Sequence, residues 1–331
     1  MSRISKFVSC LGLVSTLALT GCSSIKVHLG MRVRLDKLPI TSMEATLPKD
    51  PAIAPGEKTP LVVTFTQPDG KTLVTEGQGK GKVLWSDLAI AASVVTVNKK
   101  GVVSLAHDPR VSDGKTGHLA ITVPSHPDLH AELDIPLRYN YKFVANYSGS
   151  AGSSGLNGSD GTDGVSGSPG STDPNNPSPG GNGSAGSGGS NGQDGDPGGD
   201  APPVQVQATL RPGAHPLLQI AVTAPGRKEH FYLVDPQGGS LTVTANGGPG
   251  GSGGKGGRGG HGGAGGSGTP DGQAGQDGSD GRDGFSGPDG RGGSITVLYD
   301  PQVKPFLSTI VLSNQGGPKP IFQEQPIPPL W

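Results

Sequence analysis

Apolar and polar residues alternate over several short stretches between Ile40 and Phe143. An alternation with a period of two places every second side chain on one face, which is typical of a half-buried β-strand. Turn sequences at Pro68–Lys71 and Asn98–Gly101 separate successive stretches. This part of the chain is therefore predicted to be all-β, with strands at 61–66, 72–75, 83–86, 94–97, 102–105 and 118–123 and a long last run at 129–143.

Further short apolar runs follow in the second half of the chain and predict a second β scaffold. They lie at 204–210, 217–223, 230–234, 241–245, 295–299 and 307–312. The run Gly239–Val243 before one glycine-rich tract resembles the run Gly293–Val297 after it. We expect these similar strands to hold the two ends of that tract together.

Glycine recurs at every third position in two tracts, 149–200 and 247–293, which hold 42 of the 59 glycines. Between Gly247 and Gly266 two of every three residues are glycine. Three residues per turn is the period of the polyproline-II helix. Three states fit this period: a bundle of hydrogen-bonded glycine helices (polyglycine II), a collagen-like triple helix, and a disordered linker.

The polyglycine-II bundle explains the composition of the tracts best. Proline is sparse within the repeats, whereas collagen is usually rich in it. Two bare positions per triplet allow several neighbouring chains to approach closely, and a flexible linker needs no fixed frame. Breakers at Asp173–Pro179 and Thr269–Asp271 divide each tract in two, which predicts two hairpins and four helices.

Charged residues in the second tract form stripes with the same period. Lys255, Arg258 and His261 share one stripe, and Asp280 and Asp283 belong to another. If the chain reverses at Thr269–Asp271, residues whose numbers add to about 540 face each other. We therefore expect Lys255 near Asp283 and Arg258 near Asp280, or else two separately solvated stripes.

The N-terminus reads as a targeting segment. Arg3 and Lys6 precede an apolar run, 7–19, which is too short to span a bilayer permanently. The run ends in Leu19-Thr20-Gly21-Cys22, which resembles the lipobox of bacterial lipoproteins. The resemblance implies cleavage before Cys22 and its acylation, and Ser23 then implies delivery to the outer membrane. Several acyl chains on one residue give stable anchoring.

The first β region resembles the bacterial Ig-like domains of group 2. The resemblance rests on Trp85-Ser86, Val97-Asn98, Gly101–Ser104 and Gly117–Thr122, whereas Ala106–Lys115 is an insertion relative to that family. It implies a β-sandwich that serves as a spacer or adhesive module, with Trp85 in its core. The second half is similar in architecture to the glycine-helix bundles of Obg-type GTPase N-terminal domains and of some phage adhesin tips, without a GTPase motif.

Composition and motifs exclude several classes of function. Without Arg3 and Lys6, 24 basic residues stand against 27 acidic ones, so the net charge gives no case for nucleic-acid binding or for a generally basic membrane surface. Proline between His126 and His130 argues against a metal site, and aspartates three apart on a polyproline-II helix lie about 9 Å from each other, too far to share a calcium ion. No phosphate loop or nucleophile elbow occurs. We predict no catalytic residue, metal or cofactor.

The sequence as a whole predicts an all-β outer-membrane lipoprotein. Its parts are the signal peptide, the lipidated tether, the Ig-like β-sandwich, the β scaffold with its glycine-helix bundle, and a Pro-rich tail, at 1–21, 22–38, 39–145, 146–315 and 316–331. We expect a non-catalytic binding or adhesion protein, anchored by its lipid, whose stripe of Lys255, Arg258 and His261 contacts a protein or glycan. The alternative is a structural spacer or accessory lipoprotein of an envelope complex.

Overall fold

The computed structural model describes residues 31–213 and 215–331, and within them the chain is mostly β-sheet with few helical turns. The all-β class is thereby confirmed. The chain forms two compact units. The first contains residues 31–141, 231–239 and Trp331, and the second contains 142–230 and 240–330.

The first unit contains three antiparallel sheets of three strands each. Their orders are β1 (Ser42–Thr46), β3 (Val62–Thr66) and β4 (Thr72–Val74); β2 (Lys58–Pro60), β7 (Val102–Leu105) and β6 (Val95–Val97); and β5 (Ala89–Ser93), β8 (Gly117–Val123) and β9 (His126–Ile135). Alternate residues of β3 and β8, among them Val63, Phe65, Leu119 and Ile121, are fully buried in one hydrophobic core. The alternation in the sequence thus decides which face of each strand is inside.

Two predictions for the first unit are wrong in detail. Residues 83–86 form no strand, because Trp85–Asp87 is a 3₁₀ turn, η3, in which Leu88 N donates to Trp85 O. The run 129–143 is not one strand either. It is divided between β9 and β10 (Lys142–Asn146), which lie in different sheets. Short 3₁₀ turns η1 (Leu35–Lys37), η2 (Gly77–Gly79) and η4 (Pro109–Val111) complete the unit.

The second unit contains two sheets. In the smaller one β10 pairs in parallel with β14 (Ser240–Thr244), and β14 pairs with β16 (Ile310–Ser313). In the larger one the strands that belong to the second unit have the order β12 (Leu217–Thr223), β11 (Val204–Arg211), β15 (Ile295–Tyr299) and β17 (Ile321–Glu324). The 3₁₀ helix η5 (Pro301–Thr309) precedes β16, and β13 (His230–Val234) has four of its five residues in the first unit.

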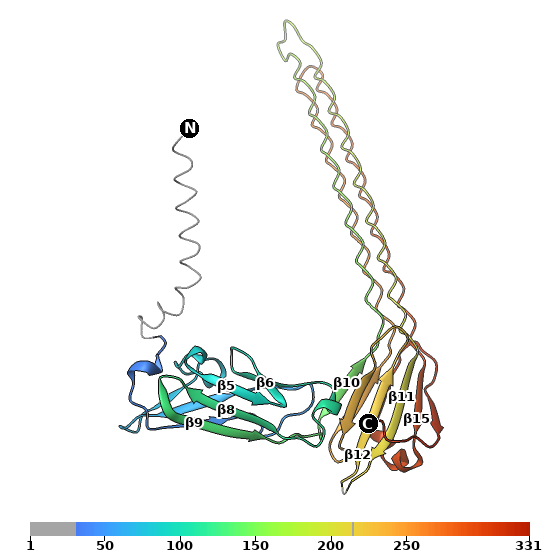
Figure 1. The fold of residues 1–331 in the computed structure, drawn as a ribbon. Coiled ribbons are helices and arrows are strands. Elements are labelled where there is room, and N and C mark those ends of the chain that lie inside the picture. Colours follow the sequence, from blue (N-terminus) through green and yellow to red (C-terminus); the bar gives the residue numbers. More distant parts are fainter. Residues whose placement is uncertain (1–30, 214) are drawn as a thin grey trace, which may run out of the picture. The chain divides into compact units, whose positions relative to one another are not determined.

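Four glycine-rich segments extend from these two sheets and run side by side (Figure 1). We call them the first (149–170), second (180–199), third (247–268) and fourth (272–293) segments, and together the glycine array. The first and third segments continue directly from β10 and β14, and the second and fourth lead directly into β11 and β15. In the smaller sheet the parallel strands β10 and β14 precede the first and third segments. In the larger sheet the parallel strands β11 and β15 follow the second and fourth segments.

The strands that resemble each other in sequence do not pair with each other. β14 pairs with β10 and β15 pairs with β11, so the two strands lie in separate sheets. The ends of the second tract are nevertheless together, as expected, because Gly293 N donates to Ala245 O at 2.8 Å. The Pro-rich tail returns to the second unit. It adds β17 to the edge of the larger sheet, and the buried Thr209 hydroxyl of β11 donates to Ile327 O at 3.0 Å.

Candidate functional site

The third segment lies at the centre of the hydrogen bonding in the array, and its triplet 256–258 shows the arrangement. Gly256 N donates to Asp283 Oδ1 of the fourth segment at 2.8 Å. Gly257 N donates to Ser190 O of the second segment at 2.9 Å, and Arg258 N donates to Asp160 Oδ1 of the first at 2.7 Å. Three successive amides thus bind three different neighbours, and each turn of the segment is fixed from three sides.

This arrangement explains why the third segment needs two glycines per triplet. A Cβ atom on Gly257 would lie 2.0 Å from Ser159 O of the first segment, and one on Gly256 would lie 2.1 Å from Gly281 O of the fourth. The third residue of each triplet, such as Arg258, is exposed. In the other segments only the frame glycine faces a neighbour this closely; a Cβ on Gly189, for example, would lie 2.1 Å from Gly257 O.

The predicted reversal at Thr269–Asp271 is present. Gly284 N donates to Gly254 O at 2.8 Å, and equivalent bonds follow along both segments. The residues that face each other have numbers that add to 538, close to the expected 540. Asp283 and Asp280 accordingly bind the amides of Gly256 and Gly259, the residues that directly follow Lys255 and Arg258.

The expected ion pairs between these residues are wrong. The carboxylates of Asp283 and Asp280 accept hydrogen bonds from the backbone amides of Gly256 and Gly259, at 2.8 and 2.7 Å. Within residues 31–213 and 215–331, Lys255 and Arg258 make no ion pair. The physical reason is length: a short aspartate side chain reaches the next segment's backbone, whereas the long side chains of Lys255 and Arg258 extend into solvent.

The stripe of Lys255, Arg258 and His261 is therefore not a basic surface. Asp160 and Asp163 of the first segment accept from the amides of Arg258 and His261. On the other side lie aspartates of the fourth segment: Asp277, Asp280 and Asp283. His261 Nδ1 lies 3.9 Å from Asp277 Oδ1. This face of the array carries mixed charge in rows fixed by the backbone.

The face formed around the second segment has a different chemistry. Serine hydroxyls accept from amides of the first segment, as Ser187 Oγ does from Thr162 N at 2.7 Å. Three large apolar side chains stand out from the array, with exposed fractions of 68% for Leu156, 76% for Val165 and 79% for Phe285. Leu156 O accepts from Gln193 N, and Phe285 N donates to Asp194 Oδ1, so Leu156 and Phe285 flank the second segment at one level. In the sequence, these three residues differ from the surrounding serines and glycines only in being large and apolar, and no other signal predicts their exposure.

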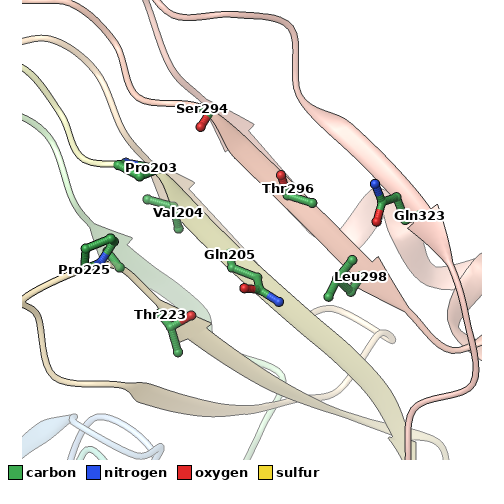
Figure 2. Close-up of a pocket in the computed structure, with 10 residues that line it drawn as sticks. Pro203, Val204, Gln205, Thr223, Pro225, Ser294, Thr296, Leu298 and Gln323 are labelled. Carbon is green, nitrogen blue, oxygen red and sulfur yellow. The ribbon is translucent and has the colours of Figure 1, made fainter.

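A groove of about 620 Å³ lies on the larger sheet of the second unit, where the array begins (Figure 2). Gln205 of β11, Thr296 and Leu298 of β15 and Gln323 of β17 line it, and Thr223 lies across from them on β12. Pro203, Pro225 and Ser294 close the end next to the glycine segments. The groove thus takes side chains from four strands.

The polar groups in this groove are uncharged and available. The lining contains two amides and three hydroxyls, from Gln205, Gln323, Thr223, Ser294 and Thr296, and no ionisable side chain. Their side chains have no hydrogen-bond partner among the residues that the structure describes. Amides and hydroxyls beside an apolar Leu298 suit a neutral polar ligand. Sequence reasoning missed the groove because alternating polar residues also mark any solvated strand face.

Cys22, the expected lipidation site, lies outside the described residues. Among residues 31–213 and 215–331, no helix has the length and apolar character needed to cross a membrane. Comparison of the chain with known protein families, with curated proteins and with solved structures finds no match.

Proposed function

We propose that the chain is a lipid-anchored, non-catalytic surface protein that binds a protein or glycan through a rigid polyglycine-II bundle. In this proposal Cys22 carries the lipid, and an Ig-like sandwich in the first unit separates the binding unit from the membrane. The lipobox, Leu19-Thr20-Gly21-Cys22, supports the anchoring. The antiparallel sheets around one buried core support the sandwich.

One observation carries the binding function: the three amides of a third-segment triplet each bind a different neighbouring segment. Backbone held in this way gives up the flexibility that glycine otherwise has. Side chains at exposed positions then stand in rows about 9 Å apart along each helix. A rigid, repetitive display of side chains suits recognition of an extended or repetitive partner and loses little conformational entropy on binding.

The test compares cells that carry the wild-type chain with cells that carry Lys255→Ala together with Arg258→Ala. Attachment to surfaces coated with neutral and acidic glycans is measured for both. We expect attachment to one coating to fall at least about tenfold, a loss of roughly 1.4 kcal/mol, while the melting temperature is unchanged. A matched control is Ser252→Ala together with Ser267→Ala, in the same stripe.

The alternative, a structural spacer of an envelope complex, makes the opposite prediction. Unchanged attachment by the Lys255 and Arg258 variant, and by a second variant in which Leu156 and Phe285 are replaced by serine, would favour the spacer. The two variants together alter exposed side chains of the first, third and fourth segments.

A further inference from the structure

Four cationic residues lie at one end of the first unit, and we call them the basic patch: Arg32, Lys80, Lys99 and Lys100. A hollow of about 350 Å³ is lined by Arg32, Lys99 and Lys100 together with Glu76, Gly77 and Trp85. Lys80 N donates to Gly77 O at 3.0 Å, so Lys80 ends the turn that begins at the hollow. Three separate loops thus place their cations on one surface.

The backbone holds these cations firmly. Asn98 Oδ1 accepts from Lys100 N and from Val102 N, which fixes the turn that carries Lys99 and Lys100. Gly101 has a φ of +70° and lies against the Trp85 ring, where a Cβ atom would be 1.9 Å from the indole. The turn is therefore packed on the core while the two lysine side chains remain exposed.

The residues that line the hollow carry a positive formal charge. Glu76 is the only acidic residue in the lining, and its carboxylate binds Arg32 Nε at 2.8 Å. Arg32, Lys99 and Lys100 together with Glu76 have a formal charge of +2, although the whole chain has a net charge of −1. A near-neutral total thus conceals a basic end of the first unit.

The chain enters the first unit at this basic end. Arg32 lies ten positions after Cys22, and ten residues span at most about 35 Å when fully extended. If Cys22 is acylated, the patch lies within that distance of the bilayer. Headgroups attract cations within a Debye length of about 8 Å, and each lysine near an anionic membrane adds to binding.

We propose that the basic patch docks on anionic phospholipid headgroups and turns this end of the first unit toward the membrane. The inference rests on the proposed lipid anchoring for its setting, although the headgroup contact itself requires no acyl chain. Charge complementarity favours this occupant: the patch offers exposed lysines on rigid turns, which suit a layer of phosphates.

The experiment uses the mature chain from residue 22 onward with Cys22→Ser, so that no acyl chain contributes. Sedimentation is measured with vesicles of phosphatidylcholine alone and with vesicles containing 30% phosphatidylglycerol, a composition of about one anionic lipid in three. We expect clear binding to the anionic vesicles only, which weakens as salt is added. Lys99→Glu with Lys100→Glu should reduce that binding roughly thirtyfold or more.

The matched control is Lys49→Glu with Lys115→Glu, which changes the net charge equally. Both lysines are exposed, and Lys115 precedes Gly117, which pairs with Ile135 at the other end of the strands. Equal binding to both kinds of vesicle, no binding to either, or equal losses in the two charge variants would overturn the proposal. Radiolabelled palmitate incorporation at Cys22 is measured separately, so failure of the patch and failure of the lipid anchoring are distinguishable.

Discussion

At the scale of single residues, the aspartates of the glycine array act as acceptors for backbone amides. Asn157, Asn182 and Asn191 have the same role, with Oδ1 atoms 2.9, 2.9 and 2.8 Å from the amides of Lys255, Gln273 and Arg282. Aspartate and asparagine are thus interchangeable in this geometry, because each offers an oxygen at the same reach. An acidic stripe opposite a basic one suggested ion pairs, and nothing local in the sequence shows that the carboxylates turn to the backbone instead.

Replacement of Asp280 and Asp283 tests this role. Asp280→Ala with Asp283→Ala removes the acceptors of Gly259 N and Gly256 N, and we expect the free energy of unfolding to fall by about 1 kcal/mol per site. The corresponding asparagine variant should retain nearly all the stability. Urea unfolding measures both. Equal losses in the alanine and asparagine variants would show that the negative charge, and not the acceptor, matters.

Glycine at the frame positions has a steric role that a second substitution tests. Gly257→Val places a side chain against Ser159 O, where even a Cβ atom would lie at 2.0 Å, and the segments must separate. We expect a loss of about 3 kcal/mol in the free energy of unfolding of the second unit. Ala264→Val is the control, because Ala264 is an exposed third residue of its triplet. Calorimetry should show a lower melting temperature for the glycine variant alone.

At the scale of elements, the sheets and the array share one register. Phe143 of β10 pairs with Leu241 of β14, and the same separation of 98 residues relates Asn157 to Lys255 in the array. In the other sheet Val206 pairs with Val297, and the same separation of 91 residues relates Asn191 to Arg282. The parallel strand pairs therefore set the register of the segments that they continue into or receive.

The sequence predicted the local features of the array but not this shared register. The triplet period, the two breakers and the reversal near Thr269 are local features, and they predicted the fold-back correctly. The pairing of the first with the third segment depends on the order of strands in a sheet, which involves residues almost a hundred positions apart. Similarity between the strands before and after the second tract correctly suggested that its ends lie together, but it did not show which strands they pair with.

Tyr147 connects the two sheets of the second unit just before the first segment begins. Its side chain is only 4% exposed, and its hydroxyl donates to Val222 O of β12 at 3.0 Å. Burial raises the pKa of the Tyr147 hydroxyl above its usual value. Tyr147→Phe removes this hydrogen bond, and we expect the free energy of unfolding at neutral pH to fall by about 1–2 kcal/mol.

The raised pKa also predicts a pH dependence. An unfolded tyrosine loses its proton near pH 10, whereas the folded chain still holds it, so the folded state binds more protons above that pH. The contribution of Tyr147 is therefore fully present below about pH 10 and is lost as the pH rises further. The difference in unfolding free energy between wild type and Tyr147→Phe, measured from pH 8 to 11, should shrink. A constant difference would contradict the buried, protonated hydroxyl.

At the scale of the whole molecule, the array is a repeat whose length is independent of the scaffold. At each height along the array, residues of all four segments are hydrogen-bonded to one another. Removal of a triplet therefore preserves these bonds only if every segment loses the triplet at the same height. We expect a variant lacking one triplet per segment, 158–160, 189–191, 256–258 and 281–283, to fold with a shorter array.

A variant lacking only 158–160 is the counterpart of this experiment. Beyond the deletion, each frame amide of the first segment would face the wrong triplet of its neighbours or lack a partner at the end. We expect a lower melting temperature and faster amide exchange toward the turns. Equal melting temperatures for the two deletion variants would mean that stability does not depend on the hydrogen-bond register between the segments.

The distance in sequence between the first and third segments also has a consequence for biogenesis. The first hairpin, 149–199, can close as soon as it is synthesised, since its two segments bond to each other directly. Its amides at the frame positions, however, find acceptors only on residues made almost a hundred codons later. Since a ribosome adds about 5–20 residues per second, these amides stay unpaired for several seconds or more. During this interval the unpaired amides of one nascent chain can bond wrongly to another chain. The hydrogen bonds of the glycine array are complete only when the fourth segment has been made.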